Sequence, residues 1–303
     1  MPYKFLIFML LLINCTAQIE IKAELPLIIP HRGGKAEFPE NTIYAFSQMD
    51  KLKITIMEID IQVTKDGIPV IYHPADLNTH SNLNGKISDY PHNIIKKAKI
   101  IDHTHINQKL YIPTLYEVLS KFKNINFIID LKSLPAKKLI DSIAKILNKS
   151  NAWNRVIFYS TDISHYNYLK KNYKLAKIFE ARDHTRERNL NMLLNESCSI
   201  PLNEDWIGLE LKRKIIIKEF FALGEGTTPI IAKLWNPEII KCINNFSKNS
   251  KIVIFGINNI EDYCESIKLG AYAVLSDHPT KMIQLKQKLE NEGVEHHCSI
   301  TNH

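Results

Sequence analysis

The sequence lacks a hydrophobic run long enough to cross a bilayer. Its N-terminal apolar stretch, residues 5–13, has nine residues, whereas a spanning helix needs about 20. The cysteines form no C-x-x-C pair and no paired C/H unit, which excludes the usual zinc patterns. No cluster of arginine with aromatic residues accompanies the net charge of +7. We therefore expect no stable membrane span and no nucleic-acid partner, although a basic surface attracts anionic substrates.

The N-terminal apolar stretch is typical of a secretory signal peptide. Lys4 precedes it, and Cys15 and Ala17 occupy the positions three and one residues before a cleavage site. These features predict a signal peptide over residues 1–17 and an exported mature chain, periplasmic or secreted. The alternative is a lipoprotein signal with a lipid anchor at Cys15, but Asn14 is bulkier and more polar than that cleavage usually accepts.

The mature chain keeps four cysteines, Cys198, Cys242, Cys264 and Cys298. An oxidising compartment permits disulfides, and four cysteines allow three pairings. Cys242 and Cys264 lie in helix-like segments and could equally be buried thiols. The sequence leaves the pairing open.

Strand-like and helix-like segments alternate along the chain. The first strand is expected at 27–29, followed by a helix over about 41–53, and residues 56–64 alternate strictly as a second strand. Further strands are predicted at 68–72, 127–131, 156–159, 177–180, 207–211, 230–234, 252–255 and 273–275. Helices are predicted at 113–122, 136–148, 237–245 and 261–269. This βα repetition with about eight strands predicts an α/β fold, a closed TIM (β/α)8 barrel.

Residues 74–110 are polar and weakly periodic, which predicts a small insertion after the strand that ends at His73. The catalytic domain is expected to cover residues 18–290. Residues 291–303 are predicted to be a flexible tail whose histidines, His296, His297 and His303, are exposed and bind no metal.

Charged side chains gather where the first two predicted strands lie. His31 and Arg32 follow the first strand in the segment PHRGGKAEFPENT, and Glu58 and Asp60 are two residues apart on the second. Two residues apart on a strand means that both carboxylates point to the same side. Burying two unpaired carboxylates in a barrel is costly, and a bound cation removes that cost. The alternative is the solvated face of an edge strand.

The strand at 127–131 adds Asp130, and Lys132 follows two residues later. An ion pair between them is the plain alternative to a functional role, and His73 alone would more often be structural. Hard oxygen ligands favour calcium or magnesium over zinc. Two histidines beside a cation suit phosphodiester cleavage, in which one imidazole takes a proton and the other delivers one to the leaving alkoxide.

These motifs resemble those of the glycerophosphodiester phosphodiesterase family. The family's HRG and PENT stand at 31–33 and 39–42, its E-x-D at 58–60, its TKDG.PV..H at 64–73, and its SDHP at 276–279. The resemblance covers about residues 27–290, and it implies a TIM barrel.

The resemblance also implies residue roles. His31 would be the general base and His73 the general acid, although the sequence does not fix which histidine takes which role. The implied ligands of one divalent cation, calcium or magnesium, are Glu58, Asp60 and Asp130. Arg32 and Lys132 would hold the substrate phosphate. Glu40 would contact the side chains that bind the substrate or metal without binding either itself, or it would orient the first loop.

The sequence departs from the family pattern at three places. Asp130 stands where the family has glutamate, Pro74 stands where it has aspartate, and Phe255 stands where it has tryptophan. None of these departures removes a catalytic group. They bear on metal and substrate affinity.

The expected activity is metal-dependent hydrolysis of small glycerophosphodiesters to an alcohol and sn-glycerol 3-phosphate. One alternative is lysophospholipase D-like activity on lysophospholipids, which needs an apolar groove that the polar insertion does not supply. Another is a catalytically inactive exported binding protein, which would require a lost catalytic residue. The sequence indicates no particular protein partner.

Overall fold

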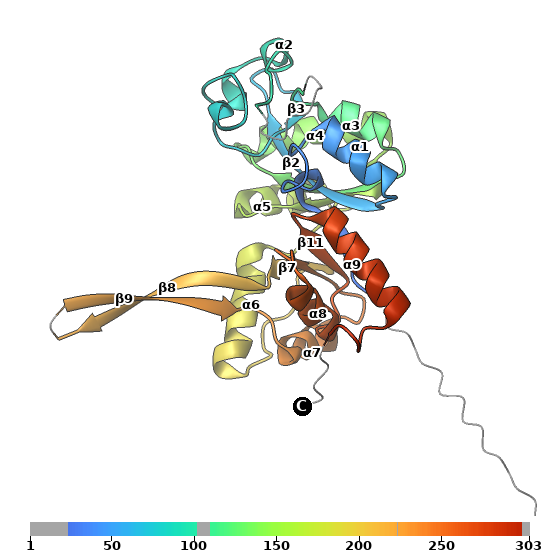
Figure 1. Ribbon diagram of the computed structural model, residues 1–303. Helices are drawn as coiled ribbons and strands as arrows, with labels where there is room; N and C mark the ends of the chain where they lie inside the picture. The colour runs from blue at the N-terminus through green and yellow to red at the C-terminus, as the bar shows by residue number, and fades with distance from the viewer. Residues whose placement is uncertain (1–23, 102–109, 223, 299–303) are drawn as a thin grey trace, which may run out of the picture.

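The computed structural model describes residues 24–101, 110–222 and 224–298 (Figure 1). The predicted signal peptide, its alternative anchor Cys15 and the terminal His303 lie outside these residues. Within the described ranges, no helix combines the length and apolar character that a membrane span requires.

The described strands form an eight-stranded parallel barrel with three further strands outside it. One run of neighbours is β2-β4-β5-β6 and the other is β1-β11-β10-β7. A parallel bridge between Phe179 and Trp206 joins the two runs. The strands are β1 (Leu27–Pro30), β2 (Ile56–Val63), β4 (Asn126–Leu131), β5 (Val156–Tyr159), β6 (Lys177–Ile178), β7 (Trp206–Glu210), β10 (Lys251–Phe255) and β11 (Ala273–Ser276).

The barrel interior is filled by apolar side chains from strands all around the ring. One buried cluster contains Ile29, Ile56, Ile128, Ile157, Phe179, Val253 and Ala273. At the seam between β1 and β2, the backbone N–H of Arg32 donates to Glu58 Oε2 at 2.8 Å. The predicted TIM barrel is confirmed.

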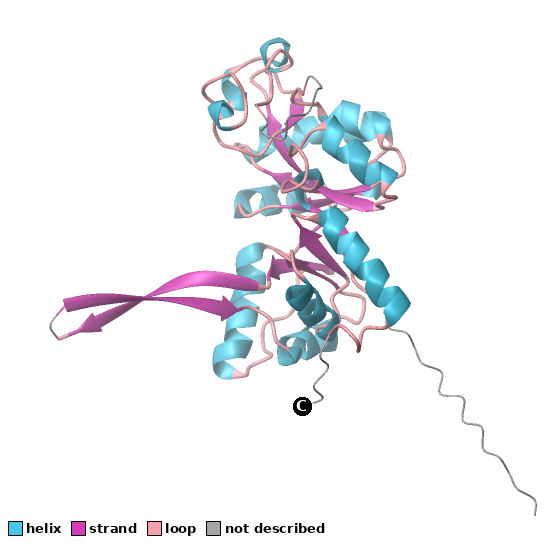
Figure 2. Ribbon diagram, viewed as in Figure 1, coloured by secondary structure: helices cyan, strands magenta, loops and turns pink. Residues whose placement is uncertain are grey.

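Helices alternate with these strands and pack outside them (Figure 2). The helix at residues 136–150 (α4) buries an apolar stripe that includes Leu139, Ile143 and Leu147. Thr42 caps α1 by accepting a hydrogen bond from the Ala45 N–H. The helices are α1 (Ile43–Lys51), α2 (His92–Ile95), α3 (Leu115–Lys121), α4 (Ala136–Ser150), α5 (Ile163–Asn172), α6 (Arg182–Asn195), α7 (Pro237–Phe246), α8 (Ile260–Lys268) and α9 (Pro279–Glu292).

Two predicted strands are not part of the barrel. The strand expected at 68–72 is β3 (Pro69–Ile71), which pairs antiparallel with β2. The strand expected at 230–234 belongs to β9 (Gly224–Lys233), which pairs antiparallel with β8 (Lys212–Phe221). Together β8 and β9 form a long two-stranded ribbon that projects from the molecule (Figure 1). A short apolar run predicts a strand but does not predict which strand it pairs with. For this reason the expectation that residues 230–234 form a strand of the barrel was wrong.

The segment between β3 and α3 carries short helical turns and α2 and has its own small core. That core contains Val70, Tyr72, Leu77, Ile87, Ile95, Ala98 and Ile112. Residues 102–109, which belong to the predicted insertion, lie outside the described part.

The four cysteines of the described residues form two disulfides, Cys198–Cys242 and Cys264–Cys298. The second pair ties the predicted tail to α8, and Cys298 is buried. His296 is exposed, whereas His297 is only partly exposed and pairs with Glu292 at 2.6 Å.

Candidate active site

Six of the predicted site residues lie on or directly after β1, β2 and β4, toward the carboxyl-terminal end of the barrel, where TIM-barrel sites are built. They are His31, Arg32, Glu58, Asp60, Asp130 and Lys132. A cavity of about 340 Å³ opens there. It is lined by residues on or directly after β1, β2, β4, β5, β7, β10 and β11. The histidine and the charged residues are His31, Arg32, Lys35, Glu58, Asp130, Lys132, Arg182, Glu210 and Asp277, and the apolar wall includes Ile128, Phe255 and Leu275.

Three buried carboxylates form the floor of this site. Asp60 and Asp130 are register partners on β2 and β4, and Glu58 is two residues from Asp60. One oxygen of each carboxylate lies within 4.8 Å of the others. Burial, together with Asp60 and Asp130, raises the pKa of Glu58 well above its usual range. Burial raises the pKa of Asp130 to about 7, and the charge of Asp60 adds to this effect.

Two cations partly compensate these carboxylates. Lys132 Nζ lies 2.5 Å from Asp130 Oδ2 and 3.3 Å from Asp60 Oδ1, while Arg32 Nε lies 3.1 Å from Asp60 Oδ2. Compensation is incomplete, because Asp130 Oδ1 is buried and accepts no hydrogen bond within the described structure. An oxygen-only cluster with an orphaned buried oxygen fits a hard divalent cation. Glu58, Asp60 and Asp130 are the residues that would hold it.

His31 is oriented by a carboxylate from the last barrel strand. Its Nδ1 lies 2.6 Å from Asp277 Oδ1, and its Nε2 lies 3.9 Å from Glu58 Oε2. Burial raises the pKa of Asp277, but the hydrogen bond to His31 and the charges of His31 and Lys35 outweigh it, so this pKa is lowered. Asp277 is therefore an anionic acceptor that fixes the imidazole.

The turn after β1 is tightly constrained. Arg32 adopts a left-handed conformation with φ of 54°, which is uncommon for a residue with a side chain. Gly33 follows with φ of 78°, and a Cβ there would lie 2.8 Å from the ring of Phe46. This conformation places the Arg32 side chain over Asp60 and its backbone N–H on Glu58, so the HRG motif fixes the geometry of the buried carboxylates.

Glu40 and Asn41 support the same groups. Arg32 Nη1 lies 3.0 Å from Glu40 Oε2, and Asn41 Nδ2 donates to Asp60 Oδ2 at 2.9 Å. The Asp60 N–H donates back to Asn41 Oδ1 at 3.2 Å. Glu40 also lies 3.4 Å from His80 Nδ1, which was not predicted.

His73 lines a neighbouring cavity of about 250 Å³ rather than the one that contains His31. Glu40, His80 and Tyr72 line the same cavity, and Lys35 lines both. Burial lowers the pKa of His73 to about 4, so its imidazole is neutral near neutral pH.

Sequence reasoning missed two contributors. Asp277 lies in the SDHP motif directly after the last strand. Its position at the end of a barrel strand could have identified it as a site residue. The second is a chain of ion pairs at the rim, in which Glu210 binds Arg182 at 2.9 Å and Arg213 at 2.6 Å. No motif marked these three residues.

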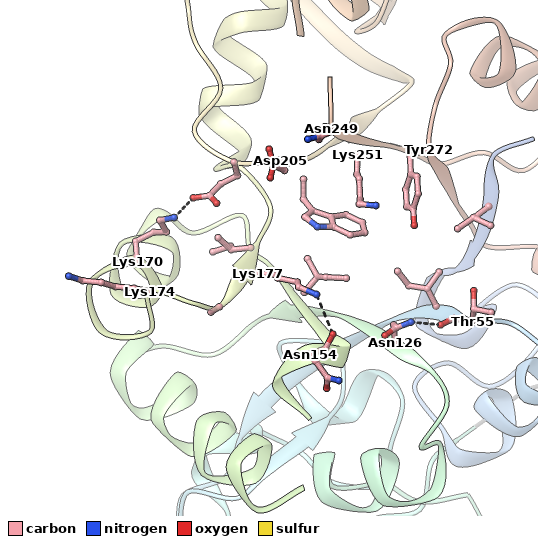
Figure 3. A pocket seen from close by; sticks show the side chains of 17 residues that line it. Thr55, Asn126, Asn154, Lys170, Lys174, Lys177, Asp205, Asn249, Lys251 and Tyr272 are labelled. Atoms are coloured by element: carbon pink, nitrogen blue, oxygen red, sulfur yellow. Dashed lines mark hydrogen bonds and ion pairs between the residues drawn. The ribbon is translucent and has the colours of Figure 1, made fainter. Parts of the chain in front are cut away.

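A larger cavity, of about 590 Å³, lies at the opposite end of the barrel (Figure 3). It is lined by first residues of strands, including Asn126, Lys177 and Lys251. Lys251 Nζ lies 4.3 Å from the centre of the Tyr272 ring, and Lys170 binds Glu204 at 2.7 Å. Lys170, Lys177 and Lys251 already have partners, and the described lining holds no cluster of carboxylates with a histidine.

Comparison with known proteins agrees with this architecture. The profile of the Glycerophosphoryl diester phosphodiesterase family matches residues 31–281. The chain is 31% identical to an uncharacterized protein of Mycobacterium tuberculosis over 267 residues, which is 84% of this chain and 87% of that protein. It is 27% identical to a glycerophosphodiester phosphodiesterase of Caldanaerobacter subterraneus subsp. tengcongensis over 270 residues, which is 86% of this chain and 98% of the relative.

Solved structures share the fold. The glycerophosphoryl diester phosphodiesterase domain of an uncharacterized Mycobacterium tuberculosis protein superposes with a TM-score of 0.77 at 28% identity, covering 87% of this chain and 100% of that one. An Oleispira antarctica phosphodiesterase, solved with the product sn-glycerol-3-phosphate, has a TM-score of 0.67 at 21% identity and covers 87% of this chain and 97% of its own. At that identity the second comparison supports the fold alone.

Proposed function

Because the chain belongs to the glycerophosphoryl diester phosphodiesterase family, we propose how this phosphoric diester hydrolase acts: it cleaves small glycerophosphodiesters in a metal-dependent reaction at the cavity beside His31. Water and the diester would give an alcohol and sn-glycerol 3-phosphate. The observation that carries the proposal is the buried cluster of Glu58, Asp60 and Asp130 next to a histidine held by Asp277.

The acidic cluster supports a divalent-cation site. A cation held by Glu58, Asp60 and Asp130 would supply Lewis-acid stabilisation of the phosphoryl oxygens. Calcium and magnesium both suit oxygen ligands. Arg32 and Lys132 stand over the same carboxylates and would hold the phosphate from the other side, since both are donors to anionic oxygens.

His31 is suited to take a proton from the attacking water. Asp277 accepts the Nδ1–H, which leaves the Nε2 lone pair facing the cluster and stabilises the imidazolium that forms. His73 would deliver a proton to the leaving alkoxide. Burial keeps its pKa near 4 in the free enzyme, and a substrate phosphate nearby would favour its protonated form because an opposite charge raises a histidine pKa.

We also propose that the mature enzyme acts outside the cytoplasm. The signal-like N-terminus predicts export, and the two disulfides support an oxidising compartment. Determination of the N-terminal residue of the exported protein would test the predicted cleavage after residue 17. An N-terminus blocked by a lipid at Cys15 would favour the anchored alternative.

Product identification on a substrate panel tests the activity. The panel is glycerophosphocholine, glycerophosphoethanolamine and lysophosphatidylcholine, and the readouts are released sn-glycerol 3-phosphate and released lysophosphatidic acid. We expect sn-glycerol 3-phosphate from the first two substrates. Turnover of lysophosphatidylcholine alone would support the lysophospholipase D-like alternative. Absence of turnover on every substrate with either metal would support the inactive binding protein.

A further inference from the structure

The ribbon of β8 and β9 exposes a set of large apolar side chains that the proposed chemistry does not use. Ile216, Phe220 and Ile231 are 64%, 74% and 72% exposed. An isolated two-stranded hairpin is only marginally stable in water, and exposed apolar patches of this kind mark interaction sites. Figure 2 shows the two strands leaving the body of the molecule, with no described helix beside their distal part.

Both faces of the ribbon carry apolar residues. Ile215 is opposite Ile230, whereas Ile216 is opposite Pro229, so these two pairs project to opposite faces. Near the tip, Phe220 and Phe221 likewise project to opposite faces. A flat protein partner covers one face of a ribbon, whereas a lipid phase surrounds the part that enters it. The two-sided apolar pattern therefore favours lipid.

The ribbon is also basic. The two strands together carry a net charge of +3, from Lys212, Arg213, Lys214, Lys218 and Lys233 against Glu219 and Glu225. Ion pairs with the body of the molecule hold Lys212, Arg213 and Lys233, so Lys214 and Lys218 are the basic residues that can meet another surface. Lys214 and Lys218 share a face with Ile216 and Phe220 and have no acidic partner in the described structure. A second copy of this chain would bring the same positive charge against it. Anionic phospholipids bring the opposite charge, and each basic residue near such a surface adds to the attraction.

The base of the ribbon adjoins the active site. β8 begins two residues after Glu210, which lines the cavity that contains His31. Arg213 binds Glu210, Lys212 binds Asp262, and Lys233 lies 3.7 Å from Glu265. These ion pairs anchor the base and leave the ribbon beyond them, residues 214–222 and 224–231, to contact another surface.

We propose that the ribbon beyond these ion pairs, residues 214–222 and 224–231, docks this enzyme on an anionic phospholipid surface. Ile216, Phe220 and Ile231 would enter at the headgroup level, where water and headgroups can satisfy the backbone groups of the free strand edges, while Lys214 and Lys218 contact the anionic headgroups. Docking would hold the catalytic mouth near the surface from which glycerophosphodiesters are derived. The binding step itself does not depend on the proposed hydrolysis.

Flotation of the mature chain with vesicles tests the docking. The vesicles are pure phosphatidylcholine and an equal mixture of phosphatidylcholine and phosphatidylglycerol, at low salt. We expect binding to the mixed vesicles, weaker binding to pure phosphatidylcholine, and loss of binding as salt is raised. No flotation with the mixed vesicles at low salt would overturn the proposal.

Variants separate the apolar contribution to vesicle binding from the electrostatic contribution. The triple variant Ile216→Thr, Phe220→Thr, Ile231→Thr keeps strand-compatible residues and should weaken vesicle binding at least about tenfold. Lys214→Gln and Lys218→Gln should each weaken it about fivefold at low salt. The matched controls are Leu175→Thr, an exposed apolar residue before β6, and Lys145→Gln on α4; both should bind like the parent chain.

Two further measurements on the parent chain and the ribbon variants complete the test. They are the turnover of soluble glycerophosphocholine and the oligomeric state. The ribbon variants should keep parental turnover, which shows that they fold, and should remain at the parental molecular mass. A parent that is dimeric, with ribbon variants that become monomeric and still float, would assign the ribbon to a second copy and overturn the proposal. Vesicle binding by a chain with no phosphodiesterase activity would refute the proposed function and leave the docking intact.

Discussion

The two ends of the barrel both carry a cavity, but they differ in how well their charges are satisfied. At the amino-terminal end Lys170 is partnered by Glu204, and Lys251 lies over the Tyr272 and Trp206 rings. At the carboxyl-terminal end the pKa values of Glu58 and Asp130 are raised by burial and by mutual repulsion. The smaller cavity is the one that needs a ligand, so unsatisfied charge identifies the site better than volume does.

The sharpest test of this difference is removal of the histidines at one end and a lysine at the other. His31→Ala and His73→Ala should each lower kcat by about 10²–10⁴-fold, the usual contribution of one proton-transfer group. Lys251→Ala, in the larger cavity, should leave kcat and KM unchanged. Steady-state hydrolysis of glycerophosphocholine measures all three. A near-normal rate for either histidine variant would remove that residue from the mechanism.

Loss of the carboxylate that orients His31 should have a smaller effect. Asp277→Asn keeps the shape of the side chain but removes the charge that stabilises the imidazolium, and we expect kcat to fall about 10²-fold with little change in KM. The dependence of kcat on pH should shift as well, and Asp277→Glu should restore part of the rate. An unchanged rate and pH profile in Asp277→Asn would mean that His31 does not act as the base.

The unfavourable burial of Asp130 at the carboxyl-terminal end should be measurable as a pH dependence of the free energy of unfolding. Without metal, the folded chain keeps a proton on Asp130 up to a pKa of about 7, whereas the unfolded chain loses it at 3.8. Stability should therefore fall as pH rises from 3.8 to about 7 and stay low above, by up to about 4 kcal/mol. Urea unfolding in chelator measures this slope, and Asp130→Asn should flatten it. A slope that is equal in both proteins would contradict the raised pKa.

The smallest expected effect concerns the shorter ligand. Aspartate at 130 leaves its carboxylate about 1.5 Å further from the cation than glutamate would, and we expect an ordered water to fill that gap at a cost of about 0–2 kcal/mol. Asp130→Glu should then bind metal equally well or more tightly. Metal titration that shows binding at least roughly tenfold weaker, about 1.4 kcal/mol, would mean that the site is rebuilt around aspartate.

The sequence predicted the barrel and most of the site because both depend on short-range patterns. Strict alternation over β2 placed Glu58 and Asp60 on one face, and Asp130 followed from the same rule on β4. Contacts between distant segments were not predictable in this way. The pairing of His31 with Asp277, the antiparallel placement of β3 and the pairing of β8 with β9 depend on which elements meet in space. The choice between the three possible disulfide pairings depends on it too.

Chelation of the purified enzyme, followed by return of metal, tests the central claim most directly. Glycerophosphocholine hydrolysis is measured after exhaustive EDTA treatment and then during titration with calcium or magnesium, for the parent chain and for Glu58→Gln. We predict that chelation abolishes turnover, that either calcium or magnesium restores it, and that Glu58→Gln requires at least about tenfold more metal because one ligand charge is lost. Full turnover after exhaustive chelation would contradict the claim that the buried carboxylates form a metal site.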